Sequence, residues 1–166
     1  MSRKLLIFSV ILVAGVVLDQ FTKYLVVREL AVGDQIPVIR GFFNLVLTYN
    51  KGAAFGLFAS MSGKFAWVFF ILSSSVVMGV VAYLWWRLPA DHDLATVGYS
   101  LIFSGAVGNL IDRVRLGEVV DFLDFHISNF HWPAFNVADS LVCIGAGLLL
   151  WYIFKEEYSQ DVSHSV

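Results

Sequence analysis

The sequence predicts an all-α membrane protein, a bundle of four transmembrane helices in a single integral membrane domain over residues 1–166. The first observation is composition: 58% of the residues are hydrophobic and 14% are charged, which is too apolar for a soluble domain of this size. The second is that four apolar segments are each long enough to cross a hydrocarbon core of about 30 Å. These segments lie at about 5–27, 65–86, 94–111 and 137–154.

Charge and cysteine content narrow the possible functions. The formal net charge is −2 and the sequence has no basic patch or stripe, so we expect no nucleic-acid partner. The one cysteine, Cys143, lies in an apolar run and has no second cysteine for an internal disulfide. We expect it to be a small core residue rather than a nucleophile.

The first apolar segment carries unusual charges. Arg3 and Lys4 precede it as in a signal peptide, but the segment continues past signal-peptide length without a small-residue cleavage site, so we interpret it as a retained helix. Asp19 and Lys23 lie in its second half, where each costs about 2.5–3.5 kcal/mol near the bilayer centre. They can neutralise each other and snorkel to the interface, or they can face a polar cavity inside the bundle.

The loop over residues 28–64 contains two stretches typical of β-strands. Residues 35–39 and 42–49 are rich in aromatic and β-branched side chains. Asn50 then begins a run of small residues that includes Gly52. This run is either a simple turn or a place where the backbone can approach a ligand closely.

The remaining apolar segments differ in character. The segment at 65–86 has no charged residue and has tryptophans near both ends, which indicates a scaffold helix with an aromatic belt at each interface. The segment at 94–111 carries Ser100, Ser104 and Gly108 four residues apart. Small residues at this spacing permit close helix contact, so we expect this helix to be central in the bundle.

Four spans place both termini on one side of the membrane and the loops at 28–64 and 112–136 on the other. The terminal side carries four Lys and Arg residues and the loop side carries seven, which opposes a simple positive-inside orientation. We still expect cytoplasmic termini and extracytoplasmic loops. Arg3 and Lys4 flank the first span directly, and several basic residues on the loop side can serve a site.

Two carboxylates on the loop side indicate a catalytic site. Asp121 lies in the second long loop and Asp139 in the first turn of the fourth helix, so they can approach each other. At about 4 Å and an effective dielectric constant near 20, their repulsion is about 4 kcal/mol, enough to make the pair share one proton as in aspartic proteases. We expect Asp139 to be the ionised member because it lies near a helix N-terminus.

The same residues also have simpler interpretations. Asn136 can be the N-cap of the fourth helix with Asp139 at its third position, a variant of the capping box. Asp112 and Arg113 can form an ion pair within the loop, and Asp124 can be a solvated loop acid.

Other functions find less support in the sequence. His126 and His131 have no neighbouring cysteine or HExxH helix, which disfavours a zinc site. A Ser–Lys pair would need Lys23 to reach Ser140 or a loop serine. A small transporter or channel subunit fits Asp19 and Lys23 but predicts polar residues in both halves of the bilayer. A non-enzymatic assembly factor predicts that acid-to-amide changes are tolerated.

Five motifs, in the same order along the chain, resemble those of bacterial lipoprotein signal peptidase (signal peptidase II), a family of aspartyl intramembrane proteases. They are Asp19-Gln-Phe-Thr-Lys23, Asn50-Lys-Gly-Ala-Ala-Phe55, Gly108-Asn-Leu-Ile-Asp-Arg113, Val119-Val-Asp-Phe122 and Phe135-Asn-Val-Ala-Asp139. The match covers essentially the whole chain, and no motif position departs from the family pattern.

The resemblance implies an endopeptidase that removes the signal peptide from diacylglyceryl-modified prolipoproteins. Water activated by two aspartates would cleave the chain just before the lipidated cysteine. Carried over by motif, Asp121 and Asp139 are the expected catalytic dyad. The expected substrate-binding or supporting residues are Asp19, Lys23, Asn50, Gly52, Asn109, Asp112, Arg113 and Asn136.

The resemblance also implies a fold detail and a location. The first long loop would form a small extracytoplasmic β-sheet cradle on the outer membrane surface. The protein would lie in the bacterial cytoplasmic (inner) membrane with cytoplasmic termini and an active site near the outer face. Its expected partners are a prolipoprotein carrying a diacylglyceryl cysteine and membrane lipids, its expected inhibitors are globomycin-like cyclic peptides, and no metal or organic cofactor is expected.

Overall fold

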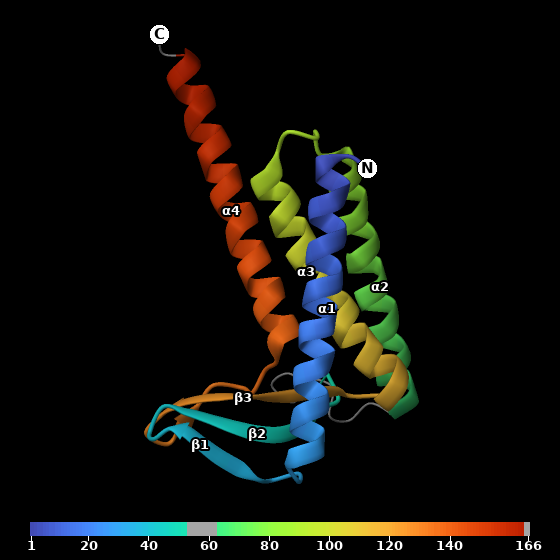
Figure 1. The fold of residues 1–166 in the computed structure, drawn as a ribbon, viewed down its shortest axis with the longest axis vertical. Coiled ribbons are helices and arrows are strands. Elements are labelled where there is room, and N and C mark those ends of the chain that lie inside the picture. Colours follow the sequence, from blue (N-terminus) through green and yellow to red (C-terminus); the bar gives the residue numbers. More distant parts are fainter. Residues whose placement is uncertain (53–62, 165–166) are drawn as a thin grey trace.

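Four long helices stand on a small antiparallel sheet in the computed structural model of the chain, which describes residues 1–52 and 63–164 (Figure 1). Each helix is long and apolar enough to cross a membrane, which confirms the predicted fold class. The end of the predicted Asn50 motif, residues 53–55, lies outside the described residues.

All four predicted spans are helical, and the helices extend beyond the apolar segments at most ends because backbone hydrogen bonding continues into the flanking polar residues. The difference matters most at the third span, which continues through Asp112 and Arg113 and ends at Gly117, whose φ of 80° terminates the helix. Asp112 and Arg113 therefore lie on a helix and not in a loop. The helices are α1 (Arg3–Glu29), α2 (Gly63–Arg87), α3 (Asp93–Leu116) and α4 (Val137–His164).

Helix α3 is central, as its small residues predict: it packs against α1, α2 and α4. Gly105 faces the backbone carbonyl of Ala138 on α4, and Gly98 faces the side chain of Leu149 on the same helix. A Cβ atom at either glycine would overlap its neighbour. Close backbone approach at these points brings the ends of α3 and α4 together at the sheet.

The sheet has the strand order β1-β2-β3-β4, and all neighbouring strands are antiparallel. The two strand-like stretches of the first loop form its first half. The second long loop supplies the other half, which the sequence analysis did not predict although residues 119–127 are rich in β-branched and aromatic side chains. The strands are β1 (Gln35–Ile39), β2 (Phe43–Asn50), β3 (Val119–Ile127) and β4 (Phe130–His131).

A small apolar core joins the sheet to the helix bundle. Val26 and Leu30 at the end of α1 pack with Leu47 of β2 and with Val120 and Phe122 of β3. Burial of these side chains holds β3 against the helix ends. Asp121, which lies between Val120 and Phe122 on β3, is thereby fixed relative to α1, α3 and α4.

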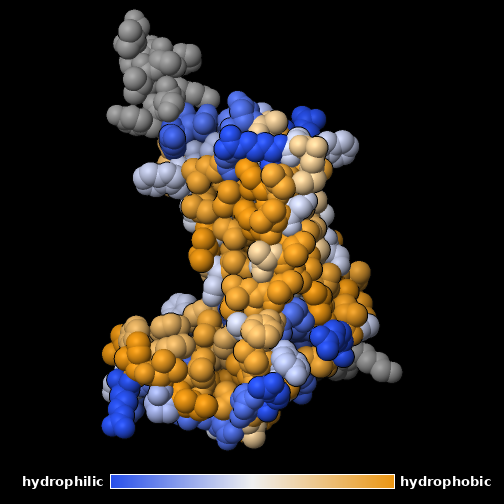
Figure 2. All heavy atoms as spheres, in the orientation of Figure 1, coloured by the Kyte–Doolittle hydropathy of each residue, from blue (hydrophilic) through white to orange (hydrophobic). Residues whose placement is uncertain are grey.

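Both termini lie at the end of the bundle remote from the sheet (Figure 1). On the face that Figure 2 shows, an apolar band covers the helices, hydrophilic residues lie at both ends of this band, and a hollow separates the bundle from the sheet that projects from it. Cys143 is exposed, so the prediction of a core position is wrong. It lies two residues from Gly145, which packs against α3, so it points to nearly the opposite side of α4.

Candidate active site

A buried ion cluster lies where α1, α3 and α4 meet the sheet. Lys23 Nζ pairs with Asp19 Oδ2 at 2.9 Å and with Asp112 Oδ2 at 2.8 Å, and it donates to Asn109 Oδ1 at 3.1 Å. The side chains of Lys23 and Asp19 are 3% and 0% exposed, so the pair faces the interior and does not snorkel. Asp112 therefore pairs with Lys23, which corrects the predicted loop ion pair with Arg113.

The cluster connects α1, α3, α4 and β3. Asp19 Oδ1 accepts the N–H of Ala138 in the first turn of α4 at 2.9 Å. Asp112 Oδ2 accepts the N–H of Val120 on β3 at 3.2 Å. Gln20 Nε2 donates to Asp112 Oδ1 at 2.9 Å and to Asp19 Oδ2 at 3.1 Å. Because its charges are paired and hydrogen-bonded, the cluster fixes the position of β3 relative to three helices.

Asp139 is held by two asparagines. Asn136 Oδ1 accepts the Asp139 N–H at 2.9 Å, and the Asn136 N–H donates to Asp139 Oδ2 at 3.2 Å. This reciprocal pair is the capping arrangement considered from the sequence. Asn109 Nδ2 donates to the other carboxylate oxygen, Oδ1, at 2.7 Å. Capping and a role in a site are therefore compatible, because the cap itself orients the carboxylate.

Asp121 is buried on β3, opposite Thr48 of β2. Its Oδ1 accepts from Asn136 Nδ2 at 2.7 Å and its Oδ2 accepts from Asn50 Nδ2 at 3.0 Å. Burial raises the pKa of Asp121 to about 6, and the charge of Asp139 acts in the same direction against the lowering effect of the two hydrogen bonds. Asn136 thus contacts both aspartates, Asp121 through its side chain and Asp139 through both its side chain and its backbone.

Arg113 and Gly52 border the same region from α3 and from the first loop. The Arg113 guanidinium lies over the Phe70 ring at 5.7 Å from Cζ to the ring centroid, and its Nη1 lies 3.3 Å from Ser74 Oγ. Gly52 has a φ of 84° and donates its N–H to Asn50 Oδ1 at 2.8 Å. A Cβ atom at Gly52 would overlap the Phe70 ring. The run after Asn50 therefore requires glycine for both its conformation and its close approach.

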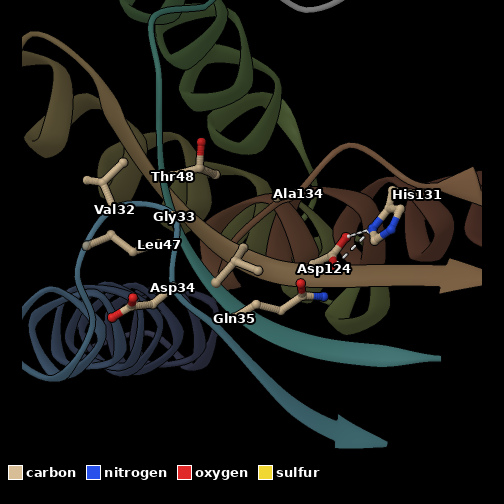
Figure 3. Close-up of a pocket in the computed structure, with 10 residues that line it drawn as sticks. Val32, Gly33, Asp34, Gln35, Leu47, Thr48, Asp124, His131 and Ala134 are labelled. Atoms are coloured by element: carbon tan, nitrogen blue, oxygen red, sulfur yellow. Dashed lines mark hydrogen bonds and ion pairs between the residues drawn. The ribbon is translucent and has the colours of Figure 1, made fainter. Parts of the chain in front are cut away.

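A separate pocket of about 400 Å³ opens beside the sheet (Figure 3). Asp124 and His131 line it, with 2.8 Å between Asp124 Oδ1 and His131 Nδ1, and Asn44 Nδ2 donates to Asp124 Oδ2 at 2.8 Å. Burial acts to raise the pKa of Asp124, but the hydrogen bonds from Asn44 and His131 lower it below its usual range. Asp124 is a buried, paired acid, so the prediction of a solvated loop acid is wrong.

The two loop histidines contact each other. The rings of His126 and His131 stack at 4.7 Å between centroids, and His131 pairs with Asp124. Within residues 1–52 and 63–164, no group of three or more His, Cys, Asp or Glu side chains is arranged to hold a metal ion.

The hydrogen bonds connect most of the residues predicted from the sequence. Arg113 lies at the border of this network, Gly52 joins it only through its backbone N–H to Asn50, and the rest are members through their side chains. Gln20 also belongs to the network and was not predicted, although a polar amide beside Asp19 in an apolar helix is a signal of the same kind. The connected residues are Asp19, Lys23, Asn50, Asn109, Asp112, Asp121, Asn136 and Asp139.

The helices can span a membrane, and Asn136 joins two aspartates at their sheet end, which is compatible with an aspartic-type membrane peptidase. The family described as signal peptidase (SPase) II matches residues 11–155 of the chain. The chain belongs to the signal peptidase II family and is an aspartic-type peptidase.

Curated relatives and solved structures agree with this assignment. The lipoprotein signal peptidase of Geobacter sulfurreducens is 49% identical over 91% of this chain and 93% of its own length. That of Halalkalibacterium halodurans is 41% identical over 92% of this chain and 94% of its own. A solved structure described as a bacterial membrane enzyme is 37% identical, with a TM-score of 0.77 over 89% of this chain and 92% of that one. The chain is accordingly a multi-pass bacterial membrane protein.

Proposed function

We propose that the chain removes the signal peptide from prolipoproteins whose cysteine carries a diacylglyceryl group, cutting just before that cysteine. Membership of the signal peptidase II family and the names of the relatives support this substrate class. The observation that carries the proposal is the contact of Asn136 with both Asp121 and Asp139, because it brings the two carboxylates to one site.

The proposed reaction uses water and two carboxyl groups. Asp139, as the carboxylate, takes a proton from a water molecule whose oxygen attacks the carbonyl carbon of the scissile bond. Asp121, as the acid, donates its proton to the carbonyl oxygen as the water oxygen attacks. Asp139 then passes the proton it took from water to the leaving nitrogen as the C–N bond breaks, and a hydroxyl of the intermediate returns a proton to Asp121 as the carboxyl product forms. The raised pKa of Asp121 favours the protonated form, and the first turn of α4 favours a negative charge on Asp139.

The other polar residues have positioning and binding roles in this proposal. Asn109 and Asn136 orient the dyad, and the ion cluster around Lys23 holds Asn109 in place. Asn50 orients Asp121, while Gly52 and Arg113 border the space in which an extended peptide would lie.

We further propose that the site lies near the outer face of the bacterial inner membrane, with both termini cytoplasmic. A lipidated cysteine keeps its acyl chains in hydrocarbon, so the adjacent peptide bond lies near an interface that water can reach. The hollow between the bundle and the projecting sheet offers space at that level (Figure 2). Globomycin-like cyclic peptides, which resemble a blocked substrate, are the proposed inhibitors.

A gel-shift assay on a purified diacylglyceryl prolipoprotein tests this function. We expect Asp121→Asn and Asp139→Asn each to lower the cleavage rate by at least about 10²–10⁴-fold, because each removes one proton-transfer group and keeps the side-chain shape. The matched control is Asp124→Asn, on the same strand and also buried but outside the dyad, which should retain cleavage.

Two outcomes contradict the proposal. Cleavage by both folded dyad variants would exclude the aspartic mechanism. The substrate class would be excluded if the wild-type protein cleaved the prolipoprotein without its lipid but did not cleave the diacylglyceryl form.

A further inference from the structure

An apolar groove runs between α2 and α3 on the side of α3 away from the dyad. It encloses about 320 Å³ and is lined by Met78 of α2 and by Val107, Leu110, Ile111, Val114 and Arg115 of α3. At about 100° per residue, Val107, Ile111 and Val114 project from the side of α3 roughly opposite to Asn109. The groove is therefore separate from the site described above.

The groove lies along the membrane-spanning part of the protein. Val114 in the groove lining is 58% exposed, so lipid has access to this side of the contact between α2 and α3. Val107 and Arg115 are eight residues apart, which places them about 12 Å apart along the helix axis. The long dimension of the groove thus runs from the bilayer interior toward the membrane interface at the sheet end of the bundle.

The cationic side chain of Arg115 lies at the interfacial end of the groove. Arg115 lies two residues before Gly117, where α3 ends, and its side chain is exposed. No carboxylate pairs with it among the described residues, and its Nη1 donates a long, weak hydrogen bond of 3.5 Å to Gln20 Oε1. An exposed guanidinium without an acid partner is well suited to bind a phosphate group through paired N–H donors.

We propose that this groove is a binding site for an anionic glycerophospholipid, whose acyl chain lies against Met78, Leu110 and Val114 and whose phosphate contacts Arg115. The apolar lining and the terminal cation match the two ends of such a lipid in the order that the bilayer imposes. This site goes beyond the proposed peptidase activity and does not depend on it.

The proposed lipid would also stabilise the fold through Gln20. Gln20 accepts from Arg115 and donates to Asp19 and Asp112 in the buried ion cluster. A phosphate on Arg115 would restrain its side chain on the Gln20 side of α3. Binding to the folded state alone raises its stability, so an anionic lipid should raise the unfolding temperature of the full-length protein.

The test uses nanodiscs that contain phosphatidylglycerol with a photoactivatable acyl chain. For the wild-type protein we expect cross-links concentrated on Met78, Leu110 and Val114, and several-fold fewer with photoactivatable phosphatidylcholine. Arg115→Gln should lower the phosphatidylglycerol cross-links several-fold and remove the rise in unfolding temperature that this lipid gives. The matched control is Arg40→Gln, an exposed arginine between β1 and β2, which should leave both unchanged.

A second variant separates the acyl-chain contact from the charge. Leu110→Trp fills the groove and should reduce cross-linking there, whereas Ile144→Trp, on an exposed position of α4, should not. Equal labelling of the groove and of α4, or unchanged labelling in Arg115→Gln, would overturn the proposal. So would preferential labelling of the groove by the diacylglyceryl chains of a prolipoprotein, since the occupant would then be substrate.

Discussion

At the scale of single residues, the pKa of Asp121 depends on burial more than on its repulsion with Asp139. Burial is the largest cause of the raised pKa of Asp121, and the charge of Asp139 adds to it. The hydrogen bonds from Asn50 and Asn136 oppose the shift and stop it near 6. Asp121 is therefore set to exchange its proton close to neutral pH, as a general acid requires.

This pKa predicts how activity changes with pH. We expect kcat/KM to fall as pH rises through about 6, because the free enzyme then loses the proton of Asp121. Bound substrate excludes more water and raises this pKa further, so the fall in kcat should occur at higher pH. Initial rates measured from about pH 5 to 9 check both statements.

The raised pKa of Asp121 also makes the stability of the folded protein depend on pH. The pKa of Asp121 is higher in the folded than in the unfolded protein, so this group favours folding at low pH, and the contribution is lost as pH rises from about 4 to about 6. The unfolding temperature should fall over this range, and the fall should be smaller in Asp121→Asn.

The roles assigned to the two aspartates can also be tested through activity. An Asp139→Asn variant that keeps most of the activity, and whose pH–rate profile keeps its basic limb, would contradict these roles.

At the scale of elements, the dyad depends on how closely α3 approaches α1 and α4. Gly108 makes this approach possible: a Cβ atom there would lie 2.5 Å from Asp19 Oδ2 and 3.2 Å from the Cβ of Ala138. Asp19 is the residue whose other oxygen holds the first turn of α4. Separation of these helices would therefore move Asp139 relative to Asp121.

We predict that Gly108→Ala lowers activity by at least about tenfold and lowers the unfolding temperature, because an overpacked contact costs about 1–3 kcal/mol. The matched control is Gly79→Ala on α2, where a Cβ atom would meet nothing within 4 Å. That change should be neutral or stabilising by up to about 1 kcal/mol, because alanine favours a helix over glycine. Thermal unfolding and prolipoprotein cleavage are measured side by side. Equal effects of the two substitutions would exclude a close helix contact at Gly108.

At the scale of the whole molecule, four spans put both termini at one end and the sheet at the other (Figure 1). The proposed outer location of the sheet predicts which surface an impermeant thiol reagent reaches in intact cells. Asn129→Cys, in the exposed turn between β3 and β4, should react from outside, and Ala90→Cys, between α2 and α3, should react only after permeabilisation. Both are made with Cys143→Ser, since Cys143 is exposed. The reverse pattern of labelling would place the termini outside.

Local patterns were enough for the spans and for the first half of the sheet. Apolar length predicted all four helices, and the aromatic and β-branched residues at 35–39 and 42–49 predicted β1 and β2. The strand at 119–127 carries the same kind of signal but was placed within the loop at 112–136, and it also contains two acids. An acid on a strand is expected to be solvated unless a partner is known, and Asn44, the partner of Asp124, is 80 residues away.

The sequence by itself determined the membrane class, the number of spans and, through its five motifs, the family and the residues to suspect. Those features depend on local composition and order along the chain, which need no tertiary contact. Only the tertiary structure decided that Lys23 pairs with Asp112 as well as Asp19, that Gln20 joins the cluster, and that Asn136 contacts both aspartates. These features depend on burial and on hydrogen bonds between helices and strands distant in sequence, and such contacts exist only after the sheet has packed against the bundle.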